Sequence, residues 1–180
     1  LDTKVHALDE QAEMLEWFVD EGARAGLAGA TVFSFTDDSG TDIHITDTAN
    51  GTEFTSVTDD AFFNTMPAWS PDGRSLVYVS NRNYSEEELF DAVVYGEGEI
   101  PTDGWVIVRH DLATGTEVYL TSAEQSPTLF PTWSPDGQKV AFIGGGPGLT
   151  DVTVVNADGT GVVAGIGSTP DVVETSVDWK

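Results

Sequence analysis

The chain has 180 residues, of which 31 are acidic and only 7 are basic, so its formal net charge is −24. Binding to nucleic acid or to anionic membranes depends on Lys and Arg side chains that replace condensed counterions, and this composition excludes nucleic acid as a partner. No apolar run is long enough to insert in a membrane, and the absence of cysteine excludes disulfides, thiol catalysis and Cys-containing zinc sites.

The acidic residues are spread along the whole chain rather than clustered. Global acidity keeps a protein soluble in concentrated salt, where screening removes its self-repulsion, whereas local acidity marks a cation site or a basic partner. The even spread favours the global interpretation and a salt-adapted source. Because the chain begins at Leu1 without a recognisable signal region, we expect a mature or excised fragment.

Residues 1–29 predict a helical segment. Leu8, Ala12 and Leu15 recur at helical spacing, and Gly26 is a suitable C-terminal stop. Together with the apolar strand pattern that follows, residues 1–38 are also similar to the last helix and strand of a glycosidase-type α/β barrel. A junction between two domains is therefore an alternative for this end of the chain.

From residue 30 onward, short alternating strands are joined by glycine turns. Residues 31–35 and 42–47 predict two strands, and a turn at Asn50-Gly51 leads to a third at 53–58. The connection at 37–42 loosely resembles a calcium loop, but it lacks the bidentate Glu at the twelfth position. We interpret it as an ordinary turn and predict no metal site.

The strongest signal is an internal repeat. Pro-Ala-Trp-Ser-Pro-Asp-Gly at 67–73 recurs as Pro-Thr-Trp-Ser-Pro-Asp-Gly at 131–137, each before an apolar strand. Trp133 and the third tryptophan of this kind, Trp179, are 46 residues apart, near the 40–45 residues of a four-stranded propeller blade. The residues that we expect to fix this architecture rather than an activity are Trp69, Asp72, Gly73, Trp133, Asp136 and Gly137.

This repeat resembles the TolB-like, WD40-like (PD40-type) β-propeller repeat, which also builds the propellers of prolyl-oligopeptidase-like and tricorn-type proteases. The resemblance implies an all-β fold, a partial propeller of about three four-stranded antiparallel blades after the N-terminal helix. The expected blades are 30–58, 66–121 and 130–166, with the start of the next at 174–180 within a propeller domain at 30–180. Since closed propellers have 4–8 blades, we expect the remaining blades in a longer chain or through self-association.

An insertion at residues 84–103 interrupts the second blade. It connects the second and third strands, so the resemblance places it on the same face as the loop that links the first two blades. Long loops on a rigid scaffold usually carry binding. The candidate loop-face residues are Phe62, Phe63, Asn64, Tyr84, Glu86, Glu87, Glu88, Phe90 and Tyr95. Alternatively, the aromatic residues cap blade cores and the acids merely solvate the loop.

No catalytic motif is present. There is no Gly-x-Ser-x-Gly sequence, and the glycine-rich stretch at 144–148 lacks the Lys-Ser/Thr of a phosphate-binding loop. We therefore predict no catalytic residues and no cofactor on this chain. The favoured function is a non-catalytic, extracytoplasmic propeller module that binds a protein, peptide or other ligand through its loop face. The alternative is an accessory propeller of a larger hydrolase, either a prolyl-oligopeptidase-like peptidase or a glycosidase whose barrel ends within residues 1–38.

Overall fold

The computed structural model describes residues 30–36, 41–47, 54–60, 62–82, 104–122, 128–144, 151–166 and 177–179. The regular structure in this part of the chain is entirely β-strand. The strands are β1 (Ala30–Thr36), β2 (Thr41–Asp47), β3 (Phe54–Ser56), β4 (Asn64–Trp69), β5 (Ser75–Ser80), β6 (Val106–Asp111), β7 (Glu117–Tyr119), β8 (Leu129–Trp133), β9 (Lys139–Ile143), β10 (Val152–Asn156) and β11 (Val163–Ile166). The helix expected within 1–29 lies outside the described residues.

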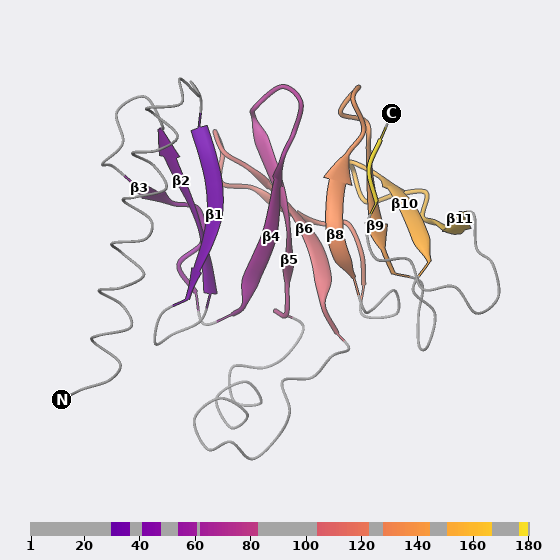
Figure 1. Cartoon of the computed structure of the whole chain (residues 1–180), viewed down its shortest axis with the longest axis horizontal. Coiled ribbons are helices and arrows are strands. Elements are labelled where there is room, and N and C mark those ends of the chain that lie inside the picture. Colours follow the sequence, from indigo (N-terminus) through magenta and orange to yellow (C-terminus); the bar gives the residue numbers. More distant parts are fainter. Residues whose placement is uncertain are drawn as a thin grey trace, which may run out of the picture.

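The strands form three antiparallel sheets in chain order: β1-β2-β3, β4-β5-β6-β7 and β8-β9-β10-β11. Figure 1 shows the sheets side by side, with β4 between β1 and β8. We call them blades 1, 2 and 3. Every strand is joined by hydrogen bonds to the strand before or after it in sequence, which is the meander of a propeller blade. The expected all-β fold of about three antiparallel blades is confirmed.

The repeated Trp-Ser-Pro-Asp-Gly sequence forms the same turn twice. Ser70 Oγ donates a hydrogen bond to Asp72 Oδ1 at 2.7 Å, and the backbone at Gly73 has a φ of 69°. In blade 3, Ser134 Oγ donates to Asp136 Oδ1 at 2.6 Å in the same way. The left-handed backbone requires glycine, and the Asp side chain closes the turn, so each motif fixes a hairpin between the first two strands of its blade.

A bulge interrupts both innermost strands at corresponding positions. The pairing of β4 with β5 shifts register between Thr65 and Ala68, and that of β8 with β9 shifts between Leu129 and Thr132. Met66 and Phe130 have positive φ angles of 52° and 53°. Each of these residues precedes a proline, which has no N–H for the hydrogen bonds between strands. A bulge allows the proline to be accommodated within the strand. The sequence pattern did not predict these bulges.

Two apolar cores lie between the blades. Ile43 of blade 1 packs with Leu76, Tyr78 and Val108 of blade 2, and Trp69 packs against this cluster. The opposite face of blade 2 supplies a second cluster with blade 3, in which Trp133 is a buried member. Both repeat tryptophans thus lie between neighbouring blades.

The part of the chain that the structure describes contains no helix that could span a membrane.

Candidate functional site

The loop that links blade 1 to blade 2 runs along one end of the sheets. The main-chain N–H of Thr41 donates to the Phe62 carbonyl at 3.2 Å, which attaches the loop to blade 1. The N–H of Phe63 donates to Asn81 Oδ1 at 2.8 Å, which attaches it to the end of β5. The loop is therefore held between two blades.

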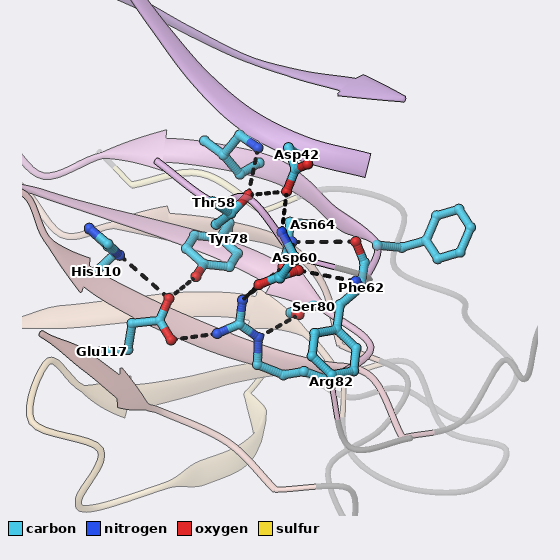
Figure 2. A network of polar contacts seen from close by, with 12 residues as sticks. Asp42, Thr58, Asp60, Phe62, Asn64, Tyr78, Ser80, Arg82, His110 and Glu117 are labelled. Carbon is cyan, nitrogen blue, oxygen red and sulfur yellow. Dashed lines mark hydrogen bonds and ion pairs between the residues drawn. The ribbon is translucent and has the colours of Figure 1, made fainter. Parts of the chain in front are cut away.

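Arg82, two residues beyond β5, lies at the centre of this region (Figure 2). Its side chain is only 7% exposed and forms ion pairs with Asp60, at 2.7 Å, and with Glu117. Its Nε also donates to Ser80 Oγ at 3.0 Å. Burial of a guanidinium requires such partners because a desolvated charge is otherwise strongly unfavourable. We define the Arg82 cluster as Asp60, Asn64, Tyr78, Arg82, His110 and Glu117.

Asp60 connects Arg82 to the linking loop. Its Oδ1 accepts hydrogen bonds from the Phe62 N–H at 3.0 Å and from Asn64 Nδ2 at 2.8 Å. The main-chain N–H of Asp60 donates to the buried carboxylate of Asp42 at 3.4 Å. The same Asp42 oxygen also accepts from Thr58 Oγ1 at 2.8 Å. One carboxylate thus binds the cation and fixes the loop backbone, so the position of Phe62 depends on the ion pair.

Glu117 is the second anionic member of the cluster, and its pKa falls to about 2. The contact with His110 Nδ1 at 3.4 Å is the largest cause, and it outweighs the effect of burial, which raises the pKa. The hydroxyl of Tyr78 donates to Glu117 at 2.6 Å, and the Arg82 charge lowers the Glu117 pKa further. Glu117 is consequently a carboxylate, not a general acid, at neutral pH.

Tyr78 and Arg82 are held in their ordinary neutral-pH forms. Burial, and then the hydrogen bond to Glu117, raises the pKa of the Tyr78 hydroxyl far above its usual range. Burial by itself would lower the pKa of Arg82, but the surrounding Tyr78, Glu117 and Asp60 raise it overall. The arrangement therefore works as an ion-pair clamp that joins the linking loop to blade 2.

We expect the Glu117→Gln variant to have a flatter dependence of stability on pH between about 4.5 and 2. Because the folded-state pKa of Glu117 is below the ordinary glutamate value of 4.5, its ionisation stabilises the fold above pH 4.5. That contribution is lost as the pH falls through about 2. Allowing for the partial solvent exposure of this carboxylate, the loss amounts to roughly 1–2 kcal/mol. Urea unfolding at several pH values measures it.

The matched control is Glu117→Asp, which keeps the charge but shortens the side chain. This variant should lower stability at pH 7 while retaining a decline below pH 4.5. Equal pH profiles for the wild type and Glu117→Gln would show that Glu117 does not carry the effect.

The described residues contain no group of three or more His, Asp or Glu side chains suited to a metal ion. Of the sequence-predicted loop-face residues, Phe62 and Phe63 are half-buried in the linking loop, and the Arg82 guanidinium lies 5.7 Å from the Phe62 ring centroid. Asn64 is fully buried and bonds to Asp60 and Arg82, so it positions the loop rather than presenting a contact surface. The other candidates lie outside the described residues: Tyr84, Glu86, Glu87, Glu88, Phe90 and Tyr95.

Sequence reasoning missed Asp60, Arg82 and Glu117. The available signal was the scarcity of basic residues, since a chain with 7 of them in 180 places an arginine two residues after a buried strand. An arginine in that position is a candidate for a buried ion pair. Its acidic partners could not be chosen among 31 candidates without the fold.

The three adjacent meander sheets, with a repeated Trp-Ser-Pro-Asp-Gly turn, define a β-propeller repeat protein of the TolB-like type. More specifically, the chain belongs to the family described as the dipeptidyl peptidase IV (DPP IV) N-terminal region, which matches residues 25–144. Among curated proteins, none matches the chain.

Solved structures with the same fold have diverse functions. A putative TolB from Agrobacterium tumefaciens is 22% identical with a TM-score of 0.58, over 75% of this chain and 44% of that one. TolB from Acinetobacter baumannii is 20% identical with a TM-score of 0.54, over 76% and 30%. A puromycin-hydrolyzing peptidase from Mycobacterium tuberculosis is 18% identical with a TM-score of 0.53, over 77% and 22%. The chain spans less than half the length of each of these proteins, and the similarity establishes the fold.

Proposed function

We propose that this chain is a non-catalytic propeller domain that binds a protein or peptide partner through its loop face. The observation that supports this most directly is the Arg82 cluster. It attaches the linking loop, with Phe62, to blade 2 through the buried pair of Arg82 and Asp60. A rigid scaffold that fixes a loop with aromatic side chains is typical of a binding surface.

A second candidate function is supported by the family. Its description refers to the N-terminal region of a peptidase, and a puromycin-hydrolyzing peptidase shares the fold. In that setting the domain would accompany a catalytic domain elsewhere in a longer protein, and the loop face would meet either that domain or its peptide substrate. Both candidates require binding of polypeptide at the same face. The similarity to TolB proteins supports an extracytoplasmic setting for this function, as expected from the sequence resemblance.

The experiment selects binders from a displayed library of random peptides against the immobilised 180-residue chain. Enriched peptides are then titrated against the Phe62→Ser variant. If the loop face is the binding surface, this change should weaken binding about tenfold, since aromatic side chains dominate such contacts. The matched control is Val163→Ser, an exposed apolar residue on the outer strand β11.

The control should leave the peptide affinity unchanged. Peptides whose affinity is insensitive to Phe62→Ser but falls with Val163→Ser would overturn the proposal. Cleavage of the selected peptides by the purified chain would contradict the non-catalytic assignment.

A further inference from the structure

The three repeat tryptophans, Trp69, Trp133 and Trp179, differ in whether the indole N–H has a hydrogen-bond acceptor. Trp133 Nε1 donates to the Ala68 carbonyl at 3.3 Å, and Trp179 Nε1 donates to the Thr132 carbonyl at 3.2 Å. In both cases the acceptor belongs to the previous repeat and is the residue just before its tryptophan: Ala68 comes before Trp69, and Thr132 before Trp133. Trp69 Nε1, in contrast, is buried and has no hydrogen-bond partner. Since buried hydrogen-bond donors are almost always paired, the unpaired indole N–H of Trp69 indicates a missing acceptor.

The missing acceptor would belong to blade 1, whose sheet has three strands among the described residues where the other two have four. Its strands correspond to the outer three of blade 2. The Ile43 carbonyl accepts from the Val57 N–H at 2.8 Å, as the Ile107 carbonyl accepts from the Leu120 N–H at 2.8 Å. Therefore β1, β2 and β3 match β5, β6 and β7, and the innermost position is the one that no described strand fills. Among the described residues, β1 pairs only with β2.

The strand registers give the position of the acceptor. In blade 2 the acceptor residue, Ala68, is opposite Val77, which is itself opposite Arg109. Because Ile107 corresponds to Ile43, Arg109 corresponds to Ile45, and Ile45 is paired with Val32 of β1. A strand that completed blade 1 would thus place its acceptor carbonyl opposite Val32. Blade 3 follows the same rule, since its acceptor Thr132 is opposite Ala141 of β9.

We propose that the inner edge of β1 is an acceptor site for an extended strand, antiparallel to β1, whose main-chain carbonyl opposite Val32 accepts the Trp69 indole N–H. The occupant is the innermost strand of a further propeller repeat, because in both satisfied cases the acceptor comes from the residue before a repeat tryptophan. A second copy of this chain is a poorer donor, since its innermost strands β4 and β8 are already paired with β5 and β9. The inference rests on the Trp69 indole and on the strand registers, so it does not depend on the proposed function.

The test uses the full 180-residue chain and a synthetic peptide with the sequence of residues 62–70, which contains β4 and its bulge. The chain is labelled with ¹⁵N, and the Trp69 indole signal is assigned from its disappearance in Trp69→Phe. We expect saturable one-to-one binding, a downfield shift of the Trp69 indole proton and at least about tenfold slower exchange with solvent. The Trp133 signal and a scrambled peptide should show no change.

Two variants separate the indole contact from a general effect on folding. Trp69→Phe should weaken peptide binding about fivefold, the contribution of one hydrogen bond. Trp133→Phe should leave peptide affinity unchanged, because its N–H is already bonded to Ala68. Peptide binding that leaves the Trp69 signal unmoved would overturn the proposal, as would the absence of binding at millimolar peptide. Dimerisation of the chain with slowed exchange at Trp69 would assign the edge to a second copy instead.

Discussion

The Arg82→Met variant is expected to lower the free energy of unfolding by about 3 kcal/mol, because it leaves two partly buried carboxylates without their cation. The side chains of Asp60 and Glu117 are 30% and 28% exposed, so water recovers part of their solvation. The loss should therefore fall at the lower end of the range for a broken buried pair. Urea unfolding at pH 7 measures it.

Three further variants identify the cause. Arg74→Met removes an exposed arginine from the turn of blade 2 and should change stability by less than about 0.5 kcal/mol. Arg82→Lys keeps the charge but cannot reach the same set of oxygens, so an intermediate loss is expected. Adding Glu117→Gln to Arg82→Met should recover part of the stability, since it removes one unpaired carboxylate. A loss for Arg82→Met no larger than that for Arg74→Met would contradict the clamp.

The same ion pair links stability to the proposed binding surface. Asp60 accepts from the Phe62 N–H while it binds Arg82, so loss of the cation frees the loop backbone as well. Arg82→Met should consequently weaken peptide binding even under conditions in which the variant remains folded. This distinguishes a positioning role from a purely global effect on stability.

The local repeats were predictable because each element is coded by neighbouring residues. The Ser70–Asp72 contact and the left-handed Gly73 lie within one turn, so the sequence Trp-Ser-Pro-Asp-Gly is sufficient to predict a hairpin. The meander order follows from several such turns in succession.

The Arg82 cluster depends on residues that are remote in sequence. Arg82 is 22 residues from Asp60 and 35 from Glu117, and no local periodicity connects them. The pairing of β5, β6 and β7 within blade 2 brings Glu117 to Arg82, and the course of the linking loop brings Asp60 to it. Asn64 illustrates the same limit, because its neighbours Phe62 and Phe63 are half-exposed while it is fully buried. The sequence suggests a loop position for Asn64, where a polar residue is expected at the surface, although Asn64 is the first residue of β4.

Concentrated KCl is expected to raise the melting temperature by about 5–15 °C between 0.1 and 2 M, corresponding to a few kcal/mol. The net charge of −24 is dispersed, so mutual repulsion among acidic side chains disfavours the compact state. In the repeated turns, hydrogen bonds to the Asp side chain lower its pKa. The largest cause is the hydrogen bond from Ser70 for Asp72 and the one from Ser134 for Asp136. These carboxylates therefore remain charged down to low pH.

The shape of the salt dependence distinguishes screening from a general strengthening of apolar burial. The Debye length is already about 3 Å at 1 M, so screening should deliver most of its gain below that concentration, whereas exclusion of a cosolvent from the protein surface continues to act. Because the Arg82 cluster is largely buried, salt should leave the loss caused by Arg82→Met nearly unchanged. A melting temperature that is constant or falls in KCl would remove the salt-adaptation hypothesis. A loss at Arg82 that disappears in 2 M KCl would show that its ion pairs behave as surface contacts.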